Sequence, residues 1–387
     1  MSPPAVAPDL LRCALPAPSP EAAAALGRPF LRDAVCAALA AARVEPRWAT
    51  PALAAHFRAD RRLGSKDRKR VQDAVYGVIR SEALLRRAGF GAGQAEVEGW
   101  AALLAGDRLD AVGAEGPAAD YATALSLPVA VAGPWLEALG PAEAAAFAQH
   151  QLRRGPITLR ANRLRCDRAG LADRLAAEGV ETRPVSGLPD ALELVGTANL
   201  VPLASAREGW FEVQDRSSQA LIELIAGLVP LRGLEVLDRC AGAGGKALAL
   251  AARGARVAAA DTRPAALHEL QQRARRAGAE VKVGLPGRRV PLVLVDAPCS
   301  GTGRLQREPA LRWSLDVAAP QRAQAALLAD AAERVSSGGI VVYATCSLVA
   351  AENAPPTPPG LRLMTRAERW PHREGGDGFS WSVYEAR

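Results

Sequence analysis

The stretch "GLEVLDRCAGAGGKALALAARG", residues 233–254, decides the fold of the C-terminal half of this chain. Its opening residues predict an apolar strand that ends at Asp238. The chain then turns through Gly242, Gly244 and Gly245 into a helix, and glycines at such a turn let the backbone approach a ligand closely. The turn is not a P-loop, because alanine follows its lysine where P-loops carry Ser or Thr.

Further apolar strands follow this turn at residues 256–261, 290–296 and 338–346, and amphipathic helices separate them. Continuous apolar strands that alternate with helices predict a parallel sheet covered on both faces, which is an α/β fold. Asp261 ends the second strand, where a carboxylate can accept hydrogen bonds from ribose hydroxyls. The glycine turn and this acid suit a dinucleotide or S-adenosyl-L-methionine, although a tight turn followed by a helix cap explains them equally well.

Two cysteines lie at the carboxyl ends of predicted strands. Cys299 follows Asp296 by three residues, and Cys346 ends the next strand in the sequence. Ligands of open α/β sheets bind at the carboxyl ends of the strands. If these two strands are neighbours, both thiols border the same crevice as the glycine turn.

The remainder of the chain divides by pattern into further segments. The length of 387 residues predicts more than one domain. We expect a disordered, Pro- and Ala-rich leader over 1–29 and an all-helical domain over 30–150. A small α/β module over 151–212 and the larger α/β domain over 213–387 complete the expectation.

Two basic segments are candidates for contact with a polyanion. Residues 58–70 carry seven Lys or Arg and two Asp, which suits either a solvated helix start or a nucleic-acid surface. The stretch "RRGPITLRANRLR", residues 153–165, alternates polar and apolar side chains and predicts an exposed basic strand. Arg160 and Arg163 are its candidate phosphate contacts. The formal net charge of +7 agrees with such a partner but is weak evidence alone.

The composition also bounds other classes of protein. Six widely spread cysteines form no CxxC pair, so we expect no metal site. The N-terminus lacks the pattern of a signal peptide, and no apolar run is long enough to span a membrane. We therefore expect a cytoplasmic protein with reduced thiols, no membrane partner and a monomeric state.

The motifs "DAPCSGTG" (296–303), "TCS" (345–347) and the turn "CAGAGGK" (240–246) together resemble those of the RNA 5-methylcytosine methyltransferases. Within that group the chain is similar to the RsmB (Sun or Fmu) family, which acts on small-subunit ribosomal RNA. Further similar stretches include "GSKDRKRVQDAVYGVIR" (64–80), which resembles that family's NusB-like RNA-binding domain, and "ITLRANRLR" (157–165), which resembles its small RNA-binding subdomain. The resemblance implies a Rossmann-like methyltransferase domain that binds S-adenosyl-L-methionine.

The resemblance also implies roles for particular residues. Cys346 would add to carbon 6 of cytosine, Asp296 would bind the ring, and Cys299 would assist release. Lys246 would favour the thiolate. The cofactor-binding residues would be Cys240, Ala241, Gly242, Ala243, Gly244, Gly245, Lys246, Asp261 and Asp296.

The chain departs from the family pattern at several points. The usual "CAAPGGKT" reads "CAGAGGKA". No acid occurs between Glu280 and Asp296, and Leu285 falls where relatives carry an acidic cofactor contact. The segment after "AEN" (351–353) is short and rich in proline, where relatives carry a longer helix.

Two alternatives stay open beside an active methyltransferase. The departures suit a ribosomal-RNA-binding protein that keeps the fold but has weak or no turnover. A nicotinamide-dependent dehydrogenase fits the glycine turn but leaves both cysteines unexplained.

Overall fold

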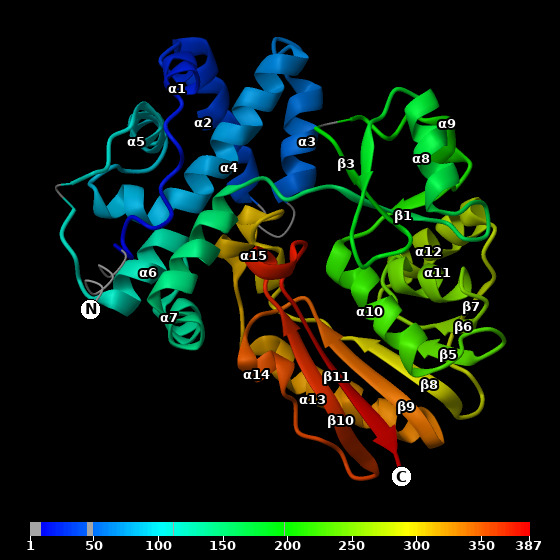
Figure 1. The fold of residues 1–387 in the computed structure, drawn as a ribbon. Helices are drawn as coiled ribbons and strands as arrows, with labels where there is room; N and C mark the ends of the chain where they lie inside the picture. The colour runs from blue at the N-terminus through cyan, green and yellow to red at the C-terminus, as the bar shows by residue number, and fades with distance from the viewer. Residues whose placement is uncertain (1–8, 45–48, 111, 197) are drawn as a thin grey trace, which may run out of the picture. The chain divides into compact units, whose positions relative to one another are not determined.

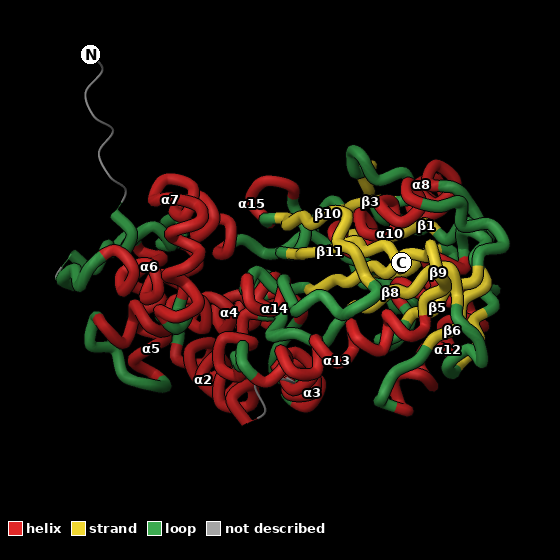
Figure 2. The backbone as a smooth tube through the Cα atoms, turned by 90° about the horizontal axis from the view of Figure 1, so that it is seen from below, coloured by secondary structure: helices red, strands yellow, loops and turns green. Residues whose placement is uncertain are grey.

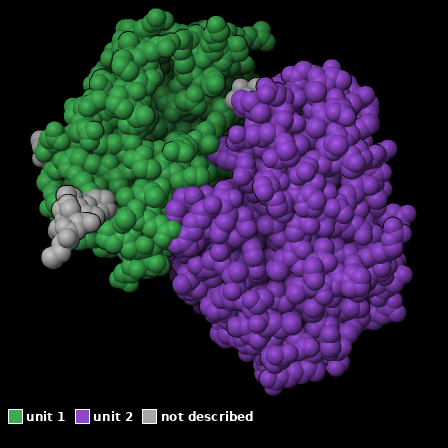
Figure 3. All heavy atoms as spheres, in the orientation of Figure 1, with its two compact units in different colours: residues 1–154, 304–315 green, residues 155–303, 316–387 purple. Residues whose placement is uncertain are grey.

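The computed structural model describes residues 9–44, 49–110, 112–196 and 198–387. The chain divides into two compact units, shown in different colours in Figure 3. One comprises Met1–Arg154 with Arg304–Leu315, and the other comprises Gly155–Gly303 with Asp316–Arg387.

The first unit is helical (Figure 1), as the patterns over 30–150 predict. Its core is aliphatic, and side chains at helical spacing such as Leu31, Val35 and Leu39 are buried in it. In the described residues its helices are α1 (Pro20–Leu26), α2 (Pro29–Val44), α3 (Ala49–Ala59), α4 (Ser65–Arg87), α5 (Gln94–Ala105), α6 (Pro117–Leu125), α7 (Val129–Leu152) and the 3-10 helix η3 (Pro309–Ser314).

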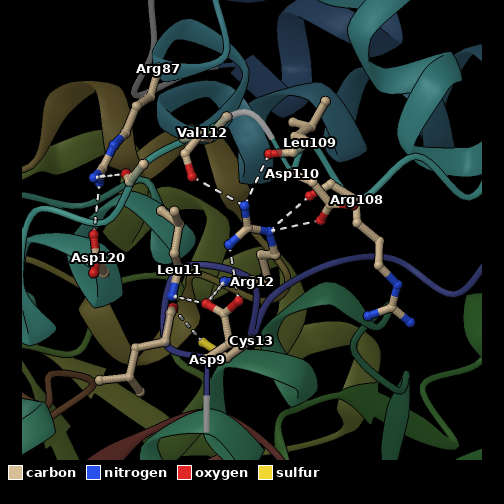
Figure 4. Close-up of polar contacts among 12 residues, drawn as sticks. Asp9, Leu11, Arg12, Cys13, Arg87, Arg108, Leu109, Asp110, Val112 and Asp120 are labelled. Carbon is tan, nitrogen blue, oxygen red and sulfur yellow. Dashed lines mark hydrogen bonds and ion pairs between the residues drawn. The ribbon is translucent and has the colours of Figure 1, made fainter.

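The leader expected to be disordered is ordered over residues 9–29, so that expectation is wrong there; residues 1–8 lie outside the described residues. Leu11 is buried in the helical core. Arg12 donates to the carbonyl oxygens of Leu109 and Val112, each at 3.1 Å (Figure 4). A Pro- and Ala-rich composition suggested disorder, but a few leucines and one arginine suffice to anchor the segment.

Residues 304–315 also correct the expected domain boundaries, because they lie in the C-terminal part of the sequence but belong to the helical unit. The buried Arg312 donates from Nε to the carbonyl oxygen of Leu125 at 2.9 Å. Trp313 donates its indole N–H to the carboxylate of Glu82 at 2.6 Å. These partners lie more than 180 residues away in the sequence, so no local pattern reveals them.

The second unit begins with the small α/β module expected over 151–212. Its four-stranded antiparallel sheet has the order β2-β3-β1-β4. The elements are β1 (Thr158–Ala161), α8 (Arg168–Ala177), β2 (Thr182–Pro184), β3 (Ala191–Leu194), α9 (Ala204–Arg207) and β4 (Phe211–Val213).

The expectation of an exposed basic strand in this module is wrong. Strand β1 lies between β3 and β4, and all four of its residues are buried. Arg160 is 4% exposed and donates from Nε to Gln214 Oε1 at 2.7 Å. Burial lowers the pKa of Arg160 to about 10. Arg163 is paired with Asp190 at 2.8 Å. Alternation along one strand predicts which side chains share a face of the sheet, but it does not reveal that residues distant in the sequence, such as Gln214, cover that face.

The larger sheet has seven strands in the order β10-β11-β9-β8-β5-β6-β7, drawn in yellow in Figure 2. The strands are β5 (Glu235–Asp238), β6 (Arg256–Ala259), β7 (Val281–Val283), β8 (Val290–Asp296), β9 (Val335–Thr345), β10 (Leu361–Arg369) and β11 (Phe379–Ala386). The helices of this part are α10 (Arg216–Leu228), α11 (Gly245–Ala251), α12 (Pro264–Ala277), α13 (Ala319–Arg334), α14 (Ala350–Asn353) and α15 (Pro371–Glu374), with the 3-10 helix η2 (Thr302–Arg304).

Both faces of this sheet are buried, which explains the continuous apolar strands. Leu292 and Leu294 of β8 share one core with α10, α11 and α12. Val293 and Val295 share the opposite core with α13. Strands β5 to β9 are parallel, as expected, whereas the antiparallel hairpin β10–β11 was not anticipated from the sequence.

Candidate active site

The glycine turn lies between β5 and α11, as the sequence predicts. Gly242 has φ +53° and Gly244 has φ +87°, both in the left-handed region that favours glycine. A Cβ on Gly244 would lie 2.6 Å from Leu270 Cγ of α12. Gly244 is therefore required by packing of α12 as well as by the backbone.

Asp261 closes onto this turn from the end of β6. The Gly242 amide donates to its Oδ2 at 2.8 Å, and Arg263 donates from Nε to its Oδ1 at 3.0 Å. Burial raises the pKa of Asp261, but the hydrogen bonds from Arg263 and Gly242 lower it by more. The pKa of Asp261 is therefore below its ordinary value. The carboxylate is thus held charged beside the turn, and Arg263 is a partner that the sequence reading missed.

Lys246 and Asp296 form an ion pair between α11 and the end of β8. The distance from Nζ to Oδ2 is 2.6 Å, and Nζ lies 5.4 Å from the centre of the Phe379 ring. Burial lowers the pKa of Lys246, but Asp296 and the neighbouring Cys346 raise it above its ordinary value. The lysine is therefore a cation at neutral pH.

The two cysteines meet because β8 and β9 are parallel neighbours. Their Sγ atoms are 3.4 Å apart, and the Gly303 amide donates to the Cys346 carbonyl oxygen at 3.0 Å. The hydrogen bond to Cys346, burial and the charge of Cys346 raise the pKa of Cys299 well above its ordinary value. Either sulfur atom can be the donor in this contact. Because the pKa of Cys299 is raised, we expect Cys299 to keep its proton when one of the two thiols ionises.

Asp238, at the end of β5, is not among the site residues that the sequence predicts. It is 1% exposed, and among the described residues neither carboxylate oxygen makes a hydrogen bond of ordinary geometry, although the Cys240 amide lies close enough to act on it. Burial and the nearby Asp296 carboxylate raise its pKa to about 7, although Lys246 and the Cys240 amide partly offset this. Asp238 therefore titrates near neutral pH.

The remaining predicted cofactor residues form the backbone of the turn. The Ala241 amide donates to the Ala260 carbonyl oxygen at 3.0 Å, and the Ala243 carbonyl oxygen accepts from Arg273 at 2.8 Å. Gly245 begins α11. Burial raises the pKa of Cys240 to about 12, so its thiol stays protonated and packs beside the apolar core.

The position that lacks the expected acid lies just beyond β7. Leu285 is 46% exposed and lines a cavity of about 910 Å³ together with residues of β6, β7 and α12. The two cysteines, Lys246 and Asp296 do not line this cavity. An apolar side chain therefore lies beyond the carboxyl end of β7, and β7 is the neighbour of β6, the strand that Asp261 follows.

The described residues hold no group of three or more His, Cys, Asp or Glu side chains that could bind a metal ion. In the same residues no single helix is long and apolar enough to cross a bilayer; α6 and α7 reach that length and composition only as a pair bent by 111°.

The seven-stranded sheet, its strand order and the glycine turn at its carboxyl edge define a Rossmann-like methyltransferase fold. Solved structures agree at the level of the fold. The chain is similar to PH0851 with a TM-score of 0.72 at 20% identity, covering 92% of this chain and 99% of that one. It is similar to NSun6 of Pyrococcus horikoshii, solved with SFG, with a TM-score of 0.58 at 17% identity, covering 67% of this chain and 98% of that one.

Sequence comparisons identify the family. Residues 226–362 match the model of the 16S rRNA methyltransferase RsmB/F, and residues 133–200 match the ferredoxin-like domain of RsmF/B-like methyltransferases. The chain is 32% identical over 270 residues to ribosomal RNA small subunit methyltransferase B of Citrobacter koseri, and 32% identical over 255 residues to that of Serratia proteamaculans. These alignments span 62% and 59% of both chains, respectively. The protein belongs to the RsmB/F methyltransferase family.

Proposed function

We propose that this protein transfers a methyl group from S-adenosyl-L-methionine to carbon 5 of a cytosine in RNA, and that small-subunit ribosomal RNA is the substrate. The observation that carries the proposal is the pair of thiols 3.4 Å apart beside the Lys246–Asp296 ion pair. The names of the relatives favour a ribosomal RNA substrate.

The residues of the turn suit the cofactor. Asp261 offers a charged carboxylate for ribose hydroxyls, and Asp238 is a buried acceptor whose oxygens make no hydrogen bond of ordinary geometry among the described residues. When bound, S-adenosyl-L-methionine supplies an electrophilic methyl group on a sulfonium. The chain's own part is to hold that group beside the thiols and to exclude water.

Cytosine needs activation because its carbon 5 is a weak nucleophile. The Cys346 thiolate forms a bond to carbon 6, and the electron pair of the 5,6 double bond moves to carbon 5, which takes the methyl group. Lys246 stabilises the thiolate before attack, and Asp296 binds the ring as charge develops. The step uses Cys346 as nucleophile and leaves the proton of Cys299 in place.

Release requires a base for the carbon 5 proton. Once Cys346 is a neutral thioether, its hydrogen bond and its charge no longer raise the pKa of Cys299. Cys299 then ionises more readily and accepts that proton, and the electron pair of the broken C–H bond re-forms the double bond and expels Cys346 as thiolate. One thiol therefore becomes the base only after the other has reacted.

A target base must leave its stack to reach this pair, so single-stranded or opened RNA is the expected substrate form. Exposed cations of the helical unit supply phosphate contacts in this proposal. Arg58, Arg61, Lys66 and Lys69 are exposed around the start of α4, in the basic segment 58–70. We expect the protein to act in the cytoplasm as a monomer.

The test is a pair of single variants incubated with ribosomal RNA and S-adenosyl-L-methionine. Cys346→Ala should abolish 5-methylcytosine, measured by bisulfite sequencing, while cofactor binding stays near wild type. Cys299→Ala should accumulate a covalent complex with RNA, seen as a slower band on a denaturing gel, and the double variant should show no such band. A wild-type rate in Cys346→Ala, or a band that persists without Cys346, would refute the assignment.

Cofactor binding without any methylation by the wild-type protein would instead support the alternative, a ribosomal-RNA-binding protein without turnover. The exposed Leu285 at the place of an expected acid is the observation that favours that alternative.

A further inference from the structure

Each of the two cysteines is followed directly by a serine, and both serines bind the same buried carboxylate. Ser300 follows Cys299 and Ser347 follows Cys346. Ser300 donates from its hydroxyl to Glu352 Oε2 at 2.6 Å, and Ser347 donates from its hydroxyl to the same oxygen. The two Cys-Ser pairs, which come from different strands, therefore share one anchor.

Glu352 lies on the short helix α14 and is 0% exposed. Its other oxygen, Oε1, accepts from the Ser300 amide at 2.7 Å. No ion pair of Glu352 occurs in the described part of the chain, so hydroxyl and amide donors satisfy the buried carboxylate. A buried charge without a cation is costly unless such donors are held in place, which ties both loops to it.

Hydrogen bonds from side chains to backbone oxygens hold α14 against the Cys346 loop. The Tyr343 hydroxyl donates to the Glu352 carbonyl oxygen at 2.7 Å, and Asn353 donates to the Ser347 carbonyl oxygen at 3.1 Å. Thr302, beyond Cys299, lies 3.1 Å from the Ser347 hydroxyl and accepts from the Leu348 amide at 2.9 Å. Motion of either loop would break several of these bonds together.

The charge of Glu352 also acts on the thiols. It contributes to the raised pKa of Cys299, whereas Cys346 is the thiol that interacts electrostatically with Lys246. An anion beside one thiol and a cation beside the other separate their tendencies to ionise. These two charges thus disfavour the arrangement in which Cys299 is the thiolate and Cys346 the thiol.

We propose that Glu352 is a positioning residue that ties both cysteine loops to one carboxylate and keeps the proton on Cys299 while Cys346 attacks. The importance of this role rests on the proposed function, but the arrangement of the thiols is measurable without RNA or cofactor. Glu352 touches neither reacting atom and acts through Ser300, Ser347 and its charge.

The experiment measures the alkylation rates of Cys299 and Cys346 by iodoacetamide at about pH 8 on the full chain, resolved by peptide mass spectrometry. We expect Cys346 to react faster than Cys299 in the wild type. Glu352→Gln keeps the shape and the bond from the Ser300 amide but removes the charge, so the ratio of the Cys299 rate to the Cys346 rate should rise about tenfold, the change in thiolate fraction for one pKa unit.

Glu368→Gln is the matched control. Glu368 accepts a hydrogen bond at 3.2 Å from Asn353, the residue that follows Glu352. Within the described residues Glu368 makes no bond to either cysteine loop. Its ratio should equal that of the wild type. If Glu352→Gln folds and the ratio of the two alkylation rates is unchanged, the proposal is overturned. Loss of a merely structural contact would lower the melting temperature but would leave the relative reactivity of the two thiols as it is in the wild type.

If circular dichroism shows that Glu352→Gln does not fold, Ser347→Ala takes its place. That variant keeps the carboxylate and removes its bond to the Cys346 loop, so the rate ratio should shift and methyl transfer should fall about tenfold. A wild-type ratio and rate would overturn the proposal. The two proposals can fail separately. If the wild type methylates no RNA, the proposed function is refuted; if the ratio of the two alkylation rates still shifts in the variant, the role of Glu352 in ordering the thiols is supported.

Discussion

Replacing Asp238 with asparagine removes a buried carboxyl group whose oxygens make no hydrogen bond of ordinary geometry among the described residues. Asparagine has nearly the same shape, so the substitution changes the charge and little of the packing. The pKa of Asp238 is raised from 3.8 to about 7, chiefly by burial and by Asp296. We therefore expect Asp238→Asn to stabilise the second unit at alkaline pH relative to the wild type.

The magnitude follows from proton linkage. At a pH between the two pKa values, Asp238 is protonated in the folded state and ionised in the unfolded state. The free energy of unfolding therefore falls as the pH rises from about 4 to about 7. The contribution is complete below the unfolded value and is lost above the folded one. With about 1.4 kcal/mol per pKa unit, the wild type should lose about 2–3 kcal/mol between about pH 5 and about pH 8 that Asp238→Asn does not lose.

Urea unfolding of both proteins at several pH values measures this difference. Asp330→Asn is the control: burial raises the pKa of Asp330, but the bonds from Arg334 and Arg239 bring it below its ordinary value. The stability that Asp330 contributes is lost only in acid, so its curve should parallel the wild type between pH 5 and pH 8. A parallel curve for Asp238→Asn as well would show that Asp238 is ionised in the folded protein and would refute the reasoning.

Two further predictions concern the cofactor and the RNA. Leu285→Asp should lower the dissociation constant for S-adenosyl-L-methionine roughly ten- to a hundredfold in calorimetry, because a hydrogen bond to a charged group contributes about 1.5–3 kcal/mol, whereas Leu285→Val should change nothing. No gain with aspartate would mean that another group makes this contact. The double variant Lys66→Glu, Lys69→Glu should weaken RNA binding and lower the slope of log affinity against log salt by about one to two units. An unchanged slope would exclude the start of α4 from the interface.

Local patterns were enough to predict the parallel strands and the helical domain of this protein. Period and composition report which residues of one element face a core, and these signals depend only on neighbours along the chain. The strand ending at Asp296 and the strand ending at Cys346 could be predicted to share an edge because parallel strands bring their carboxyl ends together. The motifs then carried the family, which the comparisons support.

The tertiary structure decided which polar groups are buried and what they meet. The sequence marked Arg160 as a surface cation, but residues distant in the sequence, among them Gln214, bury its side chain. It did not distinguish Asp238 from other strand-end acids, although burial and Asp296 raise the pKa of this one to about 7. Nor did it assign Glu352, whose bonds join residues 52 positions apart. Burial and pairing depend on segments distant in the sequence, so only the assembled fold determines them.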